Sequence, residues 1–129
     1  MAVGTGAKEF GGAALIVEDD ALIALELSDM VAEMGFGPVY VARTSCEAMA
    51  RTAAQTYAIA VIDIKLGVDE AFVVARRLKL NGSPFVFASG YTACLPADLQ
   101  AAPFVPKPFT EGTLTDAIRV AVSVHSVLP

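Results

Sequence analysis

The sequence has few cysteines, one histidine and no long apolar run, and these shortages exclude several classes of protein. Its two cysteines, Cys46 and Cys94, do not have the spacing of a metal or redox motif, and two cysteines in 129 residues do not form a disulfide scaffold. No second histidine or Cys-rich cluster accompanies His125, so we expect it to pack or to cap a helix rather than to bind a metal. The longest apolar stretches break at Asp63 or Ser89, well short of the roughly 18 residues that a membrane span needs. We therefore expect a reduced, cytoplasmic protein that does not enter a membrane.

Positive charge is also scarce. The net charge is −5 and the sequence has no run of Lys or Arg, which argues against binding to nucleic acid. Residues 1–12 lack the apolar segment of a secretory signal, and their four glycines predict a flexible leader. Residues 13–129 suit one domain with one hydrophobic core.

Short apolar runs alternate along the chain with longer segments of helical period. The predicted strands are 13–17, 39–42, 59–62, 85–88 and 104–105. The predicted helices are 20–34, 44–55, 69–80, a weak one near 96–101, and 110–127. Most of the strands are apolar throughout, as strands are when a parallel sheet is covered on both faces. The sequence therefore predicts an α/β fold, a doubly wound five-stranded parallel sheet flanked by helices.

Two of the predicted helices carry apolar residues beyond a single core stripe. The core stripe of helix 20–34 is formed by Ile23, Ala24, Leu27, Met30, Val31 and Met34. Leu22 and Leu25 fall outside it, either as ordinary exposed leucines or as a docking surface. In the last helix, which Thr110 is expected to cap, Val120, Val124 and Val127 form a second stripe. That stripe is either loosely packed or a partner surface, so we expect a monomer or a weak dimer through the last helix.

Polar residues follow most of the predicted strands at the point where each strand ends. Glu18, Asp19 and Asp20 follow the first strand, and Asp63 follows the third. Ser89 and Gly90 follow the fourth strand, and Lys107 follows the fifth. Because ligands bind beyond the carboxyl ends of strands in an open parallel sheet, these groups are expected to meet at one edge.

Together these groups have the chemistry of phosphoryl transfer. Clustered carboxylates repel one another and suit a hard divalent cation such as Mg²⁺. Asp63 is the natural nucleophile, as carboxylates are in aspartyl-phosphate chemistry. Lys107 and the metal would offset the charge of the phosphoryl oxygens, to which Ser89 would donate its hydroxyl. Gly90 would let the main chain approach closely.

These motifs resemble the receiver domains of two-component response regulators over residues 13–127. The matching segments are LIVEDD (15–20), AVIDIKL (60–66), FVFASGY (85–91) and FVPKPF (104–109). The resemblance implies a CheY-like, flavodoxin-like fold and a receiver domain over residues 13–129. It also implies that Asp63 is the phosphoacceptor and that the chain catalyses no reaction beyond its own phosphorylation and dephosphorylation.

The resemblance also assigns roles to the surrounding residues. Glu18 and Asp19 correspond to the family's acidic pair, Ser89 to its hydroxyl switch residue and Phe104 to its aromatic switch residue. Lys107 corresponds to the lysine of the family motif, and the peptide bond that follows it is expected to be cis. Asp20 has no ligand role in the family and is expected to cap the first helix.

The metal ligands implied by the resemblance are Asp19 and Asp63 directly, Glu18 through water, and Lys65 through its backbone carbonyl. The metal is Mg²⁺, for which Mn²⁺ can substitute. The ammonium group of Lys65 remains free for another task, and we expect it to modulate how long the phosphoryl group persists.

The segment 84–91 further resembles the single-domain receivers of the FATGUY group. Phe87 to Tyr91 follow that group's pattern, with Ser89 in place of Thr, and Tyr91 is a modulating position. Two departures are Thr92, which stands where the group has a second Tyr, and Lys65, which stands where it has Asn. The resemblance implies a sensor histidine kinase of the HWE or HisKA2 type as the partner. We expect no output domain after residue 127, and therefore signalling by docking to a downstream protein or by phosphotransfer.

Three rival interpretations share parts of this pattern. A phosphatase of the haloacid-dehalogenase type needs a second Asp two residues after the nucleophile, where Lys65 stands. A flavodoxin-like cofactor binder needs a Ser/Thr-rich phosphate loop where Glu18 to Asp20 would repel phosphate. A pseudo-receiver that acts without phosphorylation would be indicated by the loss of Asp63, Asp19 or Lys107, all of which are present.

Overall fold

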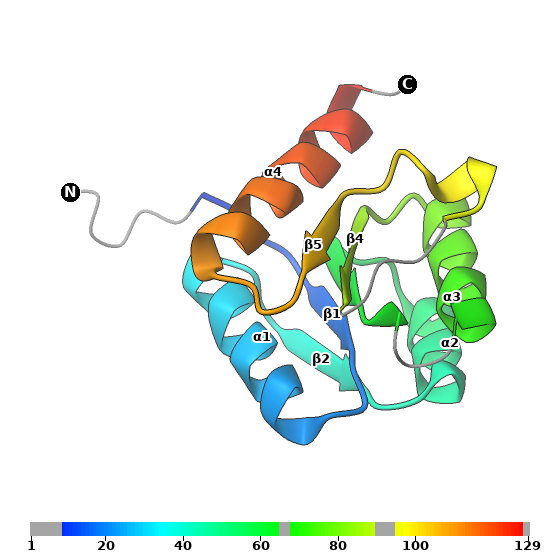
Figure 1. The fold of residues 1–129 in the computed structure, drawn as a ribbon, viewed down its shortest axis with the longest axis horizontal. Coiled ribbons are helices and arrows are strands. Elements are labelled where there is room, and N and C mark those ends of the chain that lie inside the picture. The colour runs from blue at the N-terminus through cyan, green and yellow to red at the C-terminus, as the bar shows by residue number, and fades with distance from the viewer. Residues whose placement is uncertain (1–8, 65–67, 90–94, 128–129) are drawn as a thin grey trace.

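The fold is a five-stranded parallel sheet in the order β2-β1-β3-β4-β5 (Figure 1). The computed structural model describes residues 9–64, 68–89 and 95–127. The strands are β1 (Ala14–Val17), β2 (Val39–Ala42), β3 (Ile59–Ile62), β4 (Phe85–Ser89) and β5 (Phe104–Pro106). The predicted strands and the doubly wound topology are confirmed, with strand ends that differ by no more than one residue.

Four α-helices connect and cover the strands: α1 (Ala21–Met34), α2 (Ser45–Ala54), α3 (Val68–Leu80) and α4 (Glu111–Val127). The weak helix predicted near 96–101 is a 3₁₀ turn, η2 (Ala97–Leu99), because the few residues between Pro96 and Pro103 are too short for a stable α-helix. Arg76 of α3 pairs with Asp98 of η2 at 2.8 Å and so ties this turn to the helix. In the described parts of the chain, no helix is long and apolar enough to cross a membrane.

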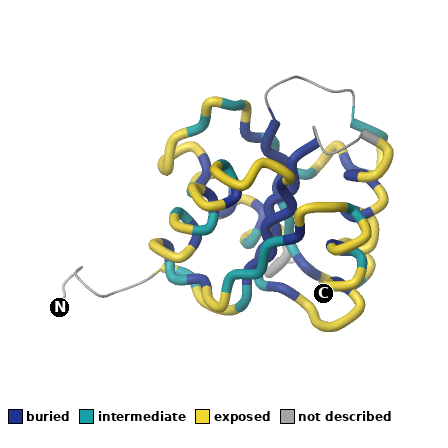
Figure 2. The backbone as a smooth tube through the Cα atoms, turned by 90° about the horizontal axis from the view of Figure 1, so that it is seen from below, coloured by how far each residue is buried: buried dark blue, intermediate teal, exposed yellow. Residues whose placement is uncertain are grey.

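Successive residues of each strand point into two separate cores, one on each face of the sheet. Ile16 and Val61 pack with α1 and α4, whereas Leu15 and Ile62 pack with α2 and α3. The central strands β1, β3 and β4 are therefore almost entirely buried between two layers of helix, whereas the edge strands β2 and β5 are partly exposed (Figure 2). This is why the sequence shows continuous apolar strands rather than an alternating pattern.

The helices begin and end where the sequence predicts. A carboxylate oxygen of Asp20 accepts hydrogen bonds from the main-chain N–H groups of Leu22 (2.9 Å) and Ile23 (3.1 Å), which caps α1. Gly35 ends α1 in the left-handed conformation, with φ of 116°. The hydroxyl of Thr110 accepts a hydrogen bond from the N–H of Thr113 at 3.1 Å and caps α4.

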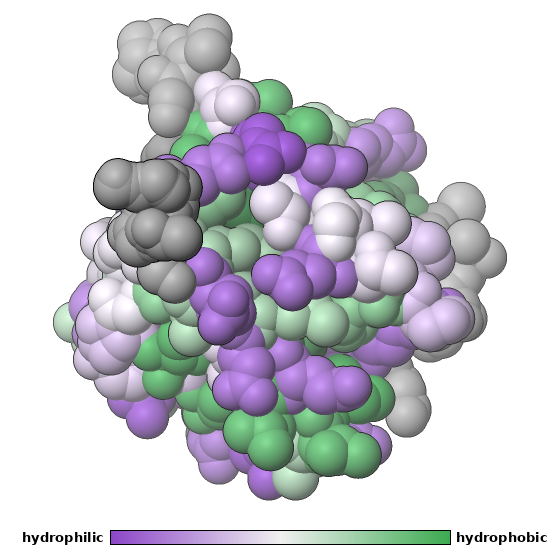
Figure 3. Space-filling model, turned by 90° about the vertical axis from the view of Figure 1, so that its left-hand side faces the viewer, coloured by the Kyte–Doolittle hydropathy of each residue, from purple (hydrophilic) through white to green (hydrophobic). Residues whose placement is uncertain are grey.

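Apolar side chains remain exposed on the two helices that cover one face of the sheet. Leu22 and Leu25 of α1 are 68% and 58% exposed, and Val120 and Val124 of α4 are each 52% exposed. The space-filling view of this side shows hydrophobic groups interspersed with hydrophilic ones (Figure 3). The side chains of His125 and Val127, which also entered the predictions for α4, lie outside the described residues.

The described end of the predicted leader contacts the domain. The Phe10 ring stacks on the buried Phe36 ring with centroids 5.0 Å apart, and the Phe10 N–H donates to the Met34 carbonyl at 3.1 Å. Both carboxylate oxygens of Glu9 accept hydrogen bonds from Arg119 of α4. One aromatic residue among glycines has no periodicity, so the sequence pattern gave no sign of this contact. The leader over residues 1–8, which lie outside the described residues, stays a prediction.

A Phe10→Ala substitution is expected to lower the free energy of unfolding by about 1–2 kcal/mol, because it removes a half-buried ring and its aromatic partner contact. Urea denaturation followed by circular dichroism measures the change. Leu80→Ala is the matched control, since Leu80 is 81% exposed and loses little burial. Equal changes in the two variants would show that the Phe10 contact does not stabilise the domain.

Candidate functional site

The register of the sheet brings the ends of its strands together. The N–H of Glu18 donates to the carbonyl of Ala42 at the end of β2, and the N–H of Asp63 donates to Val17 at the end of β1, each at 3.0 Å. At the other side of the sheet, the N–H of Lys107 donates to Ser89 at 2.8 Å. The predicted gathering of strand-end residues at one edge is therefore present.

Three carboxylates meet at this edge. Glu18, Asp19 and Asp63 each offer one oxygen, and these oxygens all lie within 4.8 Å of one another. Glu18 and Asp63 are buried, with 0% and 1% of their surface exposed, whereas Asp19 is exposed. Two buried carboxylates and one accessible carboxylate form a strongly negative, oxygen-rich site that solvent can reach from one side.

Among the described residues, Lys107 places a positive charge against this site. Its ammonium group lies 3.0 Å from Glu18 Oε1 and 3.3 Å from Asp63 Oδ2. Burial on its own would lower the pKa of Lys107, but the hydrogen bond with Glu18 and the charge of Asp63 outweigh it and the pKa is raised. Lys107 is therefore held in its charged form between the two buried acids. The Lys107–Pro108 peptide bond is cis, as the resemblance implies.

The pKa of the Glu18 carboxyl is shifted by its burial. The pKa of Glu18 is raised to about 6, mainly because the carboxyl is buried. The hydrogen bonds from Lys107 and from the Asp20 main chain act to lower this pKa, and the neighbouring Asp63 acts to raise it. One Glu18 oxygen contacts Lys107 and the other accepts from the Asp20 N–H at 3.1 Å. Both oxygens are thus engaged with the protein.

Asp20 stands apart from the three carboxylates, as predicted. Its side chain caps α1, so one of its oxygens points to the helix rather than to Asp63. Sequence proximity alone would have counted Asp20 among the acidic ligands.

The two predicted switch residues lie on the neighbouring strands. Ser89 is the last residue of β4 and is buried, and in the sheet it pairs with Pro106 of β5. Phe104 begins β5, is half-buried and packs against the core on the α2 and α3 side. The roles predicted for Lys65, Gly90 and Tyr91 fall outside the described residues and stay predictions.

One residue that the sequence analysis overlooked also reaches the site. Arg43, which directly follows β2, donates from two guanidinium nitrogens to the main-chain carbonyl of Asp19, at 3.0 and 2.6 Å. Its position directly after a predicted strand could have placed it among the strand-end residues. That position was overlooked because Arg43 is absent from the motifs that carry the resemblance.

No protein-family model matches the chain, and no curated protein matches its sequence. Solved structures do match over most of its length. One is a CheY-like response regulator receiver domain protein from Methanospirillum hungatei, with a TM-score of 0.76 and 23% identity over 88% of this chain and 95% of that one. Another is the N-terminal domain of a response regulator/sensory box/GGDEF protein from Carboxydothermus hydrogenoformans, with a TM-score of 0.73 and 20% identity over 88% and 96%. The chain has the response-regulator receiver fold.

The response regulator PhyR from Brucella abortus is also similar to the chain. Its TM-score is 0.74 and its identity is 24%, over 92% of this chain and 51% of PhyR. The chain therefore spans about half the length of PhyR. The receiver fold is shared by a protein of nearly the same size as this domain and by part of a longer regulator.

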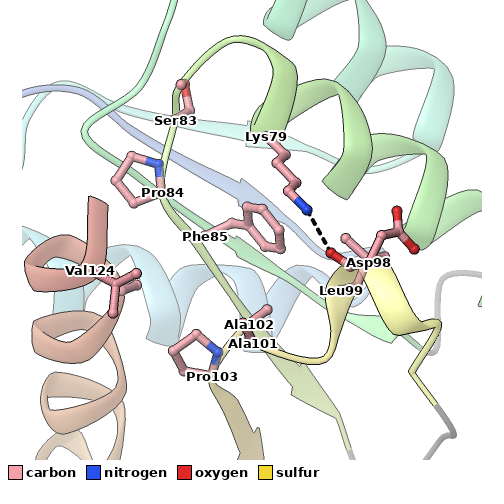
Figure 4. Close-up of a pocket in the computed structure, with 12 residues that line it drawn as sticks. Lys79, Ser83, Pro84, Phe85, Asp98, Leu99, Ala101, Ala102, Pro103 and Val124 are labelled. Carbon is pink, nitrogen blue, oxygen red and sulfur yellow. Dashed lines mark hydrogen bonds between the residues drawn. The ribbon is translucent and has the colours of Figure 1, made fainter. Parts of the chain in front are cut away.

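A cavity of about 490 Å³ lies at the opposite edge of this receiver fold (Figure 4). It is lined by residues of α3, of α4 and of the loops that precede β4 and β5, among them Lys79, Phe85, Pro103 and Val124. The Lys79 ammonium group donates to the main-chain carbonyl of Asp98 at 2.7 Å. The cavity lining is mainly apolar and shares no residue with the carboxylate site, so the cavity and the carboxylate site are separate features.

Proposed function

We propose that the chain is a response-regulator receiver that accepts a phosphoryl group on Asp63 from a sensor histidine kinase. The observation that carries this proposal is the meeting of Glu18, Asp19 and Asp63 around the ammonium group of Lys107. The receiver fold supports it, because that fold gathers residues from the ends of four strands, β1, β3, β4 and β5, at one edge.

In the proposed reaction, a carboxylate oxygen of Asp63 attacks the phosphorus of a phosphohistidine. A P–O bond forms on Asp63 as the P–N bond of the donor breaks, and the histidine nitrogen leaves with the electron pair. Lys107 already lies beside an Asp63 oxygen, where its charge can offset that of the incoming phosphoryl group. Ser89, at the end of the adjacent strand β4, would donate its hydroxyl to a phosphoryl oxygen.

The donor set fits a magnesium ion. Among the described residues, three carboxylates face the ammonium group of Lys107, so they leave an excess of negative charge that a hard divalent cation would neutralise. Asp19 and Asp63 would hold the ion directly, and Glu18, whose oxygens already have partners, would contact it through water. Bound Mg²⁺, or Mn²⁺ in its place, would supply positive charge against the phosphoryl oxygens.

The proposed partners are a sensor kinase, with the HWE or HisKA2 type favoured by the sequence resemblance, and a downstream protein. A small-molecule donor such as acetyl phosphate can replace the kinase in a first test. With Mg²⁺ present, intact-protein mass spectrometry is expected to show one added phosphoryl group, and no added group when EDTA removes the metal before the donor is added. No phosphorylation by acetyl phosphate or by any sensor kinase of the source organism would overturn the proposal.

A further inference from the structure

Arg43 holds the main chain of Asp19 with both arms of its guanidinium group. Nε donates to the Asp19 carbonyl at 3.0 Å and Nη2 donates to the same oxygen at 2.6 Å. A planar guanidinium that makes two hydrogen bonds to one oxygen fixes its direction as well as its distance. This contact joins the residue that follows β2 to the residue that carries the exposed carboxylate of the site.

The main chain of Arg43 is itself anchored by a hydrogen bond to the first turn of α2. The Thr44 hydroxyl accepts from the Glu47 N–H at 3.0 Å and caps α2, and the Glu47 carboxylate accepts from the Arg43 N–H at 2.7 Å. Ser45 then donates to Glu70 in the first turn of α3 at 3.0 Å. Arg43 therefore extends from an anchored main chain, although its side chain lies at the surface.

Asp19 is the member of the carboxylate site that most needs such support. Packing holds Glu18 and Asp63, which are buried, and Lys107 contacts both of them. Asp19 is exposed, so burial does not set the position of its carboxylate. The carbonyl that Arg43 binds belongs to the same residue as that carboxylate, so the contact restricts the main chain from which the carboxylate projects.

We infer that Arg43 is a positioning residue that holds Asp19 in place for a divalent cation. This inference rests on the proposed function, because it assigns Arg43 a task in the metal centre of that function. Outer contacts to metal-ligating residues commonly contribute tenfold or more to metal affinity.

The positive charge of Arg43 would lower the affinity for a divalent cation, whereas its positioning contact would raise that affinity. A guanidinium beside the site repels a divalent cation, so its removal should strengthen metal binding if charge were its main effect. Loss of the positioning contact should weaken binding. The sign of the change in affinity therefore separates the two effects.

The test is a calorimetric Mg²⁺ titration of the full chain in wild-type, Arg43→Met and Arg43→Gln forms. Both variants are expected to bind Mg²⁺ more weakly, Arg43→Met by about tenfold. The loss should persist between ionic strengths of about 0.01 and 1 M, because salt screens charge repulsion but does not replace a positioning contact. Arg77→Met is the matched control, since it removes the same charge from the last turn of α3.

Unchanged or tighter Mg²⁺ binding by folded Arg43→Met and Arg43→Gln would overturn the inference, and so would an equal loss in Arg77→Met. If wild type binds Mg²⁺ and accepts a phosphoryl group in these cases, the proposed function stands and the role of Arg43 alone fails. If wild type binds no Mg²⁺, the role of Arg43 falls together with the metal centre.

Discussion

An Asp63→Asn variant is expected to take up no phosphoryl group from acetyl phosphate or from a kinase. The amide is a poor nucleophile and lacks the negative charge that the reaction requires. Asp63 is also the carboxylate that has both the acidic pair and the Lys107 ammonium around it. Glu18 shares these neighbours, but one of its oxygens is held by Lys107 and the other by the Asp20 N–H, so we do not expect it to replace Asp63.

Intact-protein mass spectrometry after incubation with the donor and Mg²⁺ measures the effect. Asp20→Asn is the matched control, because it makes the same chemical change close to the site. Asparagine caps a helix as well as aspartate does, so this control should keep α1 intact and still be phosphorylated. A labelled Asp63→Asn protein would place the phosphoacceptor elsewhere in the chain.

Most of the fold could be predicted because local signals and global packing agree. Continuous apolar runs mark strands buried on both faces, and this pattern predicted the bounds of β2 and β3 without error. The helical period predicted the end of α1 at Met34, and Asp20 caps its start as expected. The contact between Phe10 and Phe36 could not be predicted, since it joins a residue without periodicity to one 26 positions away.

The site was predictable in its membership and less so in its pairings. A parallel sheet dictates that strand-end residues share an edge, which placed Glu18, Asp63 and Lys107 together. The sheet does not dictate which side chains bond. Lys107 pairs with Glu18, and Arg43 donates to the Asp19 carbonyl. Both contacts depend on side-chain conformations and helix caps that the sequence pattern does not determine.

Asp19→Asn is expected to weaken Mg²⁺ binding by at least about 30-fold. At a separation of about 4 Å, a carboxylate and a divalent cation attract by about 2 kcal/mol even at the dielectric constant of water, and a direct ligand lies closer. Each 1.4 kcal/mol changes a binding constant tenfold. The substitution keeps the size of the side chain, so the loss reflects charge and ligation.

Asp20→Asn should change Mg²⁺ affinity little, although it removes the same charge from the next residue. The Asp20 carboxylate caps α1, whereas an oxygen of Asp19 lies within 4.8 Å of oxygens of both Glu18 and Asp63. Calorimetric titration of the two variants under identical conditions makes the comparison. Equal losses would mean that the negative charge of the loop as a whole attracts the cation and that Asp19 is not a ligand. A large loss in Asp19→Asn alone would assign the exposed ligand position to Asp19, the residue that Arg43 holds.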